Sequence, residues 1–172
     1  ACMLFFRNIF GVSPRHVVLF LLVLLASTAL WWLPYDGIRI SGDADYYHRV
    51  GMHLARGDGY VVDGVPTMFR EPGYPAFISL IYKFIGIHPR AVLVAQVILL
   101  FITGLLLFHI GLRFIGEKVA IISAVIVLAY PVLNFYSAQI YSEILATFLV
   151  TVVVWSYAHA EETTSVYWYI LS

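Results

Sequence analysis

Residues 91–112, AVLVAQVILLFITGLLLFHIGL, decide the class of this fold. A helix needs about 20 mostly apolar residues to cross the hydrocarbon layer of a membrane, and this stretch reaches that length. The whole chain agrees, because 62% of its 172 residues are hydrophobic, 12% are charged and the mean hydropathy is +0.89. Such a composition is far too apolar for a soluble domain. The sequence therefore predicts an all-α integral membrane protein.

Three other stretches approach the same length, so we expect about four membrane-spanning helices. The four predicted spans are 16–35, 91–112, 119–136 and 143–160. The first span begins like a signal peptide, but its apolar run is longer than a signal core and no small-residue cleavage motif follows. We therefore expect an uncleaved span that ends in an aromatic belt, formed by Trp31, Trp32 and Tyr35.

Basic residues flank the first two spans on one side of the membrane. They are Arg7, Arg15, Arg113 and Lys118. Because basic flanks stay in the cytoplasm, residues 1–15 are predicted to be cytoplasmic and residues 36–90 external, in the periplasm or lumen. Residues 161–172 are expected to form a cytoplasmic tail or to begin a further span. Since the chain starts at Ala1 and ends in another apolar run, we expect a processed or incomplete chain.

The balance of charges and the cysteine count exclude several classes of protein. Ten basic and ten acidic residues give a formal net charge of zero, so no overall field would recruit nucleic acid. The single cysteine, Cys2, excludes an internal disulfide framework. No Cys/His spacing resembles a metal site, so no metal ligands are predicted, and a requirement for a divalent cation stays open.

The external segment 36–90 has its own predicted structure. Within residues 41–60, apolar residues recur at i, i+3, i+4 and i+7, which predicts an amphipathic helix. These residues are Tyr47, Val50, Gly51 and Leu54, and the opposite face carries His48, Arg49, His53 and Arg56. The helix is too short and too polar to span, so we expect it along the membrane interface, with its apolar face toward lipid or toward the spans.

A turn and a second short helix complete this segment. Asp63-Gly64 between β-prone runs predicts a two-residue hairpin, and Pro66 restricts the second strand to an edge. FREPGYP, residues 69–75, follows and fixes the chain direction, because each proline locks its own φ and extends the residue before it. Residues 76–86 then predict a helix that ends at Gly86 and lies at or partly in the membrane.

Taken in order, these segments resemble the N-terminal part of GT-C superfamily glycosyltransferases of the dolichyl-phosphate-mannose protein mannosyltransferase type. The family's Asp-x-x-x-Tyr pattern is matched by Asp43 and Tyr47. Its Arg-x-Pro-Gly-Tyr-Pro pattern is matched by Arg70, Pro72, Gly73, Tyr74 and Pro75. The order and spacing agree over residues 16–158, whereas family members are usually longer and have more spans. The resemblance implies transfer of a sugar from a polyprenyl-phosphate donor to an acceptor on the external face, by an inverting displacement.

The resemblance also implies roles for individual residues. Asp43 is the candidate general base that takes the acceptor's hydroxyl proton, and Asp45 is the second candidate. Asp43 before an amphipathic run also fits a helix N-cap, and both roles can hold together. Arg70 is a candidate for binding the carrier's phosphate, because a guanidinium suits bidentate phosphate contacts. The alternative for Arg70 is a salt bridge to Asp43, Asp45 or Glu71.

Other polar residues receive weaker assignments. Tyr47 and Tyr74 join Arg70 as substrate-binding candidates through the two motifs. Glu143 lies at the outer end of the fourth span, and a carboxylate so close to hydrocarbon predicts a substrate-binding role, with interfacial solvation as the alternative. His48 and His53 lack the i, i+4 spacing of a helical metal pair and are interpreted as polar-face residues. His109, within the second span, is expected to be satisfied by packing.

A second class of function fits the same sequence. The chain could be a non-catalytic integral subunit of a larger membrane assembly, and its short length favours this alternative. Membrane lipid is a partner under both hypotheses. A polyprenyl-phosphate sugar donor is a partner of the enzyme, and other membrane protein subunits are partners of the alternative. In the enzyme, residues 69–75 would hold the Asp43 helix over the spans and supply Arg70, whereas in a subunit they would only shape a docking surface.

Overall fold

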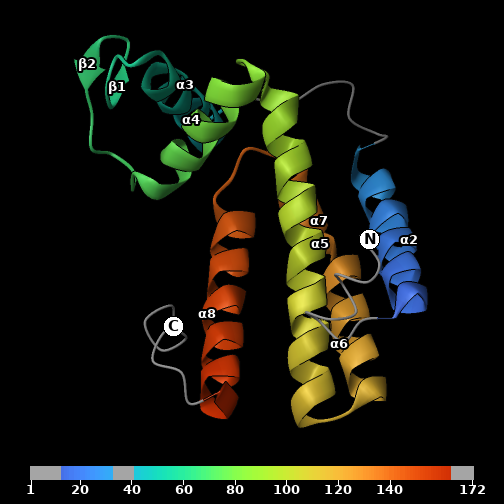
Figure 1. Cartoon of the computed structure of the whole chain (residues 1–172). Coiled ribbons are helices and arrows are strands. Elements are labelled where there is room, and N and C mark those ends of the chain that lie inside the picture. Colours follow the sequence, from blue (N-terminus) through green and yellow to red (C-terminus); the bar gives the residue numbers. More distant parts are fainter. Residues whose placement is uncertain (1–12, 33–40, 164–172) are drawn as a thin grey trace.

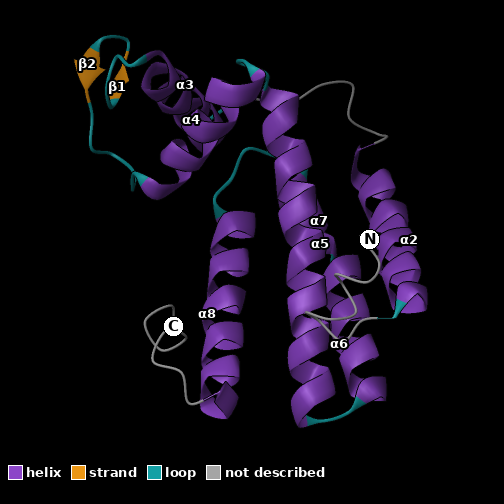
Figure 2. Ribbon diagram, viewed as in Figure 1, coloured by secondary structure: helices purple, strands orange, loops and turns teal. Residues whose placement is uncertain are grey.

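The computed structural model describes residues 13–32 and 41–163 of the chain. In order, its elements are α2 (Pro14–Trp32), α3 (Asp43–Arg56), β1 (Val61–Val62), β2 (Val65–Pro66), α4 (Gly73–Ile85), α5 (Pro89–Phe114), α6 (Glu117–Ala129), α7 (Pro131–Ser137) and α8 (Glu143–Thr163). Helices α2, α5, α6, α7 and α8 form a bundle, and α3, α4 and the two strands form a lobe at one end of it (Figures 1 and 2). The prediction of a mostly helical membrane protein is confirmed.

Two of the described helices are long and apolar enough to cross a membrane. They are α5 over Pro89–Phe114 and α8, over Glu143–Ala160. Helices α6 and α7 pass this test only as a pair, and they are bent by 50° at the break between them. Helix α2 is apolar over Pro14–Leu30 but is shorter than the test requires. Two or three spans are therefore supported by length and composition, and a fourth stays a prediction.

Several predictions fall on parts of the chain that the structure does not describe. The side chains of Trp31 and Trp32 and the whole of Tyr35, the predicted aromatic belt, lie outside the described residues. Arg7 and the predicted tail beyond residue 163 lie outside them too. These expectations stay predictions.

The predicted span 119–136 is broken into two helices at Pro131. Proline has no N–H to continue a helix and pushes the preceding residue into an extended conformation, and Tyr130 has φ −65° and ψ 118°. The Asn134 amide nitrogen donates hydrogen bonds to the carbonyls of Leu128, at 2.9 Å, and Tyr130, at 3.0 Å. The Ser27 hydroxyl of α2 lies 2.9 Å from the same Leu128 carbonyl. Buried polar side chains thus satisfy the backbone groups that the break leaves free.

Glycines bring α5 and α6 close together in the bundle. A Cβ added at Gly104 would lie 2.8 Å from the Leu128 side chain, and one added at Gly111 would lie 2.9 Å from the Ala120 Cα. Small residues allow this approach, which is a common device where membrane helices pack. Helices α2 and α8 lie on opposite sides of the α5–α6 pair (Figure 1).

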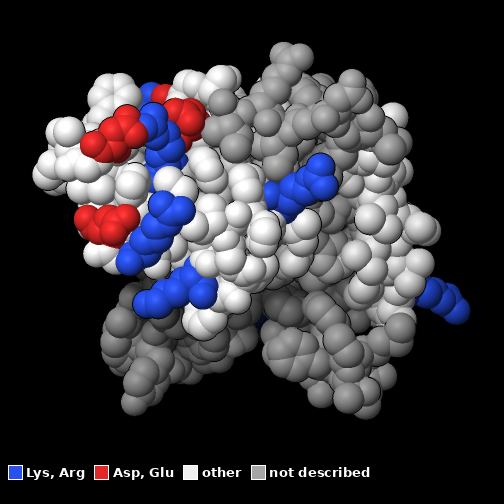
Figure 3. Space-filling view, turned by 90° about the horizontal axis from the view of Figure 1, so that it is seen from above, with Lys and Arg blue, Asp and Glu red and all other residues white. Residues whose placement is uncertain are grey.

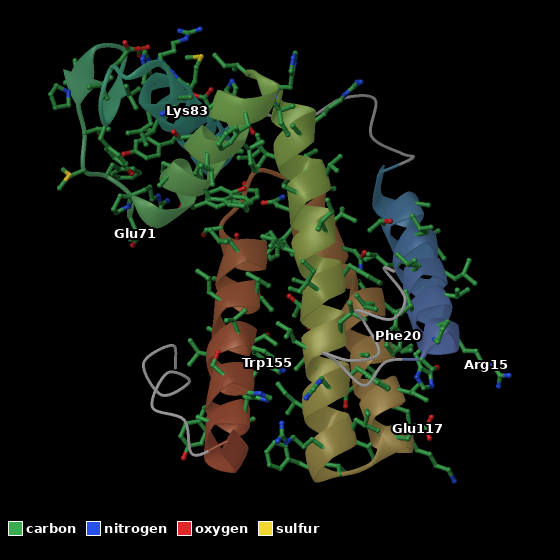
Figure 4. All side chains as sticks on the ribbon, in the orientation of Figure 1. Arg15, Phe20, Glu71, Lys83, Glu117 and Trp155 are labelled. Atoms are coloured by element: carbon green, nitrogen blue, oxygen red, sulfur yellow. The ribbon has the colours of Figure 1, made fainter. Side chains whose placement is uncertain are left out.

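The starts of α2 and α6 meet at the end of the bundle opposite the lobe. The His16 Nε2 lies 3.3 Å from the Glu117 Oε1, and Figure 4 shows Arg15 and Glu117 at this end. The sequence predicted that Arg15 and Lys118 lie on one side of the membrane, and the packing agrees with that part of the prediction. Which side of a membrane this end would face stays a prediction.

In the lobe, α3 packs on α4 through the face that the sequence identified. Tyr47, Val50 and Gly51 are buried there. A Cβ on Gly51 would lie 2.5 Å from the Ile78 Cγ2, so glycine is what allows the two helices to touch. The apolar face of α3 was predicted to turn toward lipid or toward the spans, but α4 covers it instead.

The hairpin prediction is confirmed. Strands β1 and β2 pair antiparallel, with Val62 opposite Val65. Asp63 and Gly64 join them with φ angles of 51° and 77°, as a type I′ turn requires. The Arg49 guanidinium forms an ion pair with Asp63, which ties the hairpin to α3.

Helix α4 begins three residues earlier than the sequence predicted. The predicted range was 76–86, and the helix runs from Gly73 to Ile85. Pro75 lies in its first turn, where a helix leaves backbone N–H groups unbonded and tolerates proline. Gly86, with φ 94°, ends the helix as predicted. The second half of FREPGYP is therefore the first turn of a helix and not a separate joint.

Candidate functional site

The candidate site centres on an ion pair between the first residue of α3 and the segment before α4. The Arg70 Nη2 donates a hydrogen bond of 2.6 Å to the Asp43 Oδ1. The two side chains are 35% and 39% exposed, so a ligand can reach both. Gly42 occupies the N-cap position, so the alternative in which Asp43 is the N-cap is wrong. Asp43 still lies in the first turn, where the helix dipole favours a carboxylate.

The backbone around Arg70 is fixed by Tyr60. The Tyr60 hydroxyl donates a hydrogen bond of 2.8 Å to the Arg70 carbonyl, and the Phe69 ring lies 5.0 Å from the Arg70 guanidinium carbon. The hydrogen bond with Asp43 raises the pKa of Arg70, which therefore stays charged. The Arg70 Nε is buried and has no hydrogen-bond partner among the described residues. One donor of the guanidinium fork is thus uncommitted.

A buried glutamine joins the lobe to the bundle. The Tyr74 hydroxyl, at the start of α4, donates a hydrogen bond of 2.6 Å to the Gln96 Oε1 of α5. The Gln96 amide nitrogen in turn donates to the carbonyls of Gln139, at 2.7 Å, and Ser137, at 3.3 Å. The Tyr74 ring also packs edge-on against Tyr47 of α3 at 4.9 Å. Gln96 therefore fixes the start of α4 relative to the segment that leads into α8.

Glu143 is the first residue of α8, at the position predicted for the end of a span. Its Oε2 is buried and has no hydrogen-bond partner in the described part of the chain. Burial raises the pKa of Tyr74, and the charges of Tyr82 and Glu143 add to this effect. No hydrogen bond or ion pair within the described residues joins Glu143 to Asp43 or Arg70.

Asp45 is engaged elsewhere. Its Oδ2 lies 3.6 Å from the Arg49 Nη1, and Arg49 also pairs with Asp63 of the hairpin. The structure therefore brings Asp43 together with Arg70 and leaves Asp45 in a separate ion-pair group. Seen from the lobe end, basic and acidic side chains gather over the lobe (Figure 3).

A hollow opens beside Arg70. It has a volume of about 230 Å³ and is lined by Tyr60, Met68, Phe69, Arg70, Glu71 and Pro72. Pockets that enclose drug-sized ligands measure about 300–1,000 Å³. This hollow is smaller, so it can hold one part of a ligand, such as a phosphate group or one sugar ring.

The histidines of the lobe have protein partners. The His48 Nδ1 lies 2.8 Å from the Tyr82 hydroxyl, and burial lowers the pKa of His48 against the opposing charge of Asp45. The His53 Nδ1 lies 2.9 Å from the Asp58 Oδ2. In the bundle, the His109 ring packs edge-on against Trp155 at 6.1 Å, as the packing interpretation predicted. Among the described residues, no group of three His, Cys, Asp or Glu could hold a metal ion.

Sequence reasoning missed two residues that build this site. Gln96 is an amide within the apolar stretch 91–112, and buried polar groups in a membrane helix need a partner, so the signal was present. Tyr60 gave no such signal, because its role depends on where the hairpin brings the chain back.

Comparison with protein families matches residues 66–172 to the model for dolichyl-phosphate-mannose-protein mannosyltransferases. No curated protein and no solved structure matches the chain. The family match includes Arg70, Tyr74 and Glu143, and it begins after Asp43 and Tyr47. The resemblance drawn from the motifs is thereby confirmed at the level of the family.

Proposed function

Because the chain belongs to the dolichyl-phosphate-mannose-protein mannosyltransferase family, we propose that it serves glycosyl transfer at a membrane. The family indicates a membrane glycosyltransferase-like function and implies a polyprenyl-phosphate-linked sugar donor. In our proposal the acceptor is a hydroxyl group on the external face. The observation that carries the proposal is the exposed ion pair of Asp43 and Arg70, since a carboxylate and a guanidinium are the two groups that this reaction needs side by side.

The proposed reaction is an inverting displacement at the anomeric carbon. The acceptor oxygen forms a bond to that carbon while the bond from the carbon to the donor's phosphate oxygen breaks. The bonding electron pair leaves with the polyprenyl phosphate, and the acceptor's proton passes to the Asp43 carboxylate. A nearby cation stabilises the charge that develops on the phosphate.

Asp43 and Arg70 divide these tasks through different atoms. The Asp43 Oδ1 accepts the hydrogen bond from Arg70, which orients the carboxylate and leaves Oδ2 for the acceptor's proton. Arg70 uses Nη2 for Asp43 and its side chain is 35% exposed, so its other exposed N–H groups can donate to a phosphate oxygen. The salt bridge between Arg70 and Asp43 was the alternative to phosphate binding by Arg70, and the two are compatible. Asp45 is the second candidate for the base and is the less suitable one, because the arginine beside it, Arg49, is also paired with Asp63 of the hairpin.

The remaining candidates have supporting roles. We assign Glu143 to a sugar hydroxyl, because its Oε2 is buried and unpartnered in the described part of the chain. Tyr74 is 4% exposed and its hydroxyl is bound to Gln96, so we give it a positioning role in place of a substrate contact. Tyr47 is 5% exposed and packs against Tyr74, which supports the same role.

The proposal includes a topology. The bundle spans the membrane several times with residues 1–15 in the cytoplasm, and the lobe lies on the external side, where membrane lipid and the lipid-linked donor reach it. Arg15, at the end opposite the lobe, supports this orientation (Figure 4). Other membrane subunits are partners only under the alternative of a non-catalytic subunit.

This function is tested by measuring the transfer of labelled sugar from a panel of polyprenyl-phosphate sugars. The assay uses the full-length protein in membranes. We expect transfer with at least one donor, and its loss in an Arg70→Ala variant. Arg56→Ala is the matched control, because Arg56 is an exposed arginine at the far end of α3. Absence of transfer with every donor, together with a protein partner covering residues 36–90, would establish the subunit in place of the enzyme.

A further inference from the structure

Four residues on the lobe form an unusually exposed apolar surface. Met68 is 93% exposed, Phe69 72% and Val65 65%, and Pro66 between them is also exposed. We call the two of these residues that follow β2, Met68 and Phe69, the tip, because β2, with Val65 and Pro66, lies at the end of the lobe far from α8 (Figure 1). Single exposed apolar residues are normal on protein surfaces, whereas a contiguous group marks a contact with a partner or a membrane.

The exposure of the tip is not the result of a loose loop. The Thr67 N–H donates a hydrogen bond of 3.1 Å to the Tyr60 carbonyl, and the Tyr60 hydroxyl holds the Arg70 carbonyl at 2.8 Å. The Tyr46 and Thr67 hydroxyls lie 3.2 Å apart, and the Phe69 ring packs edge-on against Tyr46 at 5.7 Å. The backbone on both sides of Met68 is therefore fixed while its side chain points away from the lobe.

The position of the tip relates it to the membrane-crossing helices. The chain between β2 and α4 runs along the outer edge of the lobe toward the level of the near end of α8 (Figures 1 and 2). Glu71, near the end of this segment, lies at the edge of the lobe closest to that level (Figure 4). The apolar stretch of α8 begins at Glu143, so the end of this segment lies near the level at which α8 begins its candidate span.

Helix α4 extends the apolar character of this side of the lobe. Leu80 and Phe84 are 57% and 81% exposed, and they lie on the face of α4 opposite to Ile78, which α3 covers. After α4 the chain passes through residues 86–88 directly into the membrane-crossing α5. The exposed apolar face is thus continuous with a helix that must enter lipid.

We propose that the tip inserts into the interfacial layer of the bilayer and anchors the lobe on the leaflet that the lobe faces. A phenyl ring and a thioether gain by leaving water at the boundary of headgroups and acyl chains. Arg70 follows directly, with its guanidinium 5.0 Å from the Phe69 ring, and would lie among the lipid phosphates. The anchor does not depend on the proposed transfer reaction.

Depth-dependent fluorescence quenching tests the anchor in the whole protein. In a background with Cys2 replaced by Ser, an environment-sensitive fluorophore is attached to Met68→Cys or Phe69→Cys, and the protein is reconstituted in phosphatidylcholine vesicles. Arg56→Cys, at the end of α3, serves as the aqueous control, and Val150→Cys, 64% exposed on α8, serves as the lipid control. Each label is exposed to iodide in water and to a nitroxide at a shallow acyl position.

We expect the labels at residues 68 and 69 to show a blue-shifted emission that the shallow nitroxide quenches and iodide does not, and the Val150 label, deeper in the span, to share their protection from iodide. Two results would each overturn the anchor. One is quenching by iodide at the level of the Arg56 control, which would place the tip in water. The other is protection from both quenchers, which would show that protein covers it. Sugar transfer is measured separately with labelled donors, so the anchor and the proposed function can fail separately.

Discussion

Arg70 donates a 2.6 Å hydrogen bond to Asp43 across 27 residues of sequence. Two different elements therefore meet at the candidate site: the first turn of α3, and the segment between the hairpin and α4. The α3–α4 contact and the bond from Tyr60 to the Arg70 carbonyl hold these elements in place. The geometry of the pair thus depends on the packing of the whole lobe, so the predictions below test the lobe and its pair together.

Replacing Arg70 with Lys separates charge from geometry. Lysine keeps a positive charge that can reach Asp43, but it has no Nε and no planar fork, so a phosphate loses its bidentate contact. We expect KM for the lipid-linked donor to rise by about tenfold, or about 1.4 kcal/mol, with a smaller change in kcat. Steady-state kinetics over a range of donor concentrations measure both. An unchanged KM would mean that Arg70 only orients Asp43.

Gly51→Ala tests the contact between α3 and α4. Alanine favours a helix by about 0.8–1.0 kcal/mol over glycine, but its Cβ would lie 2.5 Å from the Ile78 Cγ2. Forcing an atom into a packed contact costs about 1–3 kcal/mol, so the clash should prevail and lower the thermal stability. Thermal unfolding in detergent measures the change.

Two further variants make the Gly51 prediction specific. Gly73→Ala is the matched control, because a Cβ there would meet nothing within 4 Å. In an Ile78→Ala background the Cγ2 is gone, and the penalty of Gly51→Ala should shrink. Equal penalties in both backgrounds would show that the Ile78 Cγ2 is not the atom that opposes the added methyl group, because the Cβ at position 78, 2.9 Å away, remains.

Gln96→Leu tests the joint between lobe and bundle. Leucine has a similar size but would leave the Tyr74 hydroxyl and the Gln139 carbonyl without their partner. Each buried group that loses its hydrogen bond costs about 1–3 kcal/mol, so we expect a clear drop in thermal stability. Ile98→Ala, at a position 54% exposed on the same helix, is the control. A drop no larger than that of the control would remove Gln96 from the joint.

Local features of the lobe could be predicted from the sequence because neighbouring residues encode them. Asp63-Gly64 provides the two positive φ angles of the turn, and Gly86 ends α4 where the sequence placed its stop. The apolar face of α3 follows from the helical repeat of Tyr47 and Val50. Each of these features depends on residues within about two helical turns of one another.

The partners across the fold could not be predicted in the same way. Arg70 had three candidate carboxylates, and only the packing of α3 on α4 selects Asp43. Asp43 was predicted as a cap because side-chain preference alone suits that position, but the helix starts at Asp43 itself. The break at Pro131 was not predicted, because the apolar residues on both sides of it fit one continuous span.

Cysteine accessibility in sealed membranes tests the orientation. We expect Asp63→Cys, in the turn of the hairpin, to react with a membrane-impermeant maleimide added outside, and Lys118→Cys to react only after the membrane is opened. The basic residues at the end of the bundle that holds Arg15 are the physical reason. The reverse pattern would place the lobe in the cytoplasm and exclude transfer on the external face.

Sugar transfer by Asp43→Asn, in membranes and with the protein as encoded, tests the central claim most directly. Asparagine keeps the size of the side chain and an oxygen that can accept the Arg70 hydrogen bond, but it cannot take the acceptor's proton. We predict a kcat lower by about 10²-fold or more, with normal insertion in the membrane, and a much smaller effect of Asp45→Asn. Transfer by Asp43→Asn at the wild-type rate would contradict the account and place the base elsewhere.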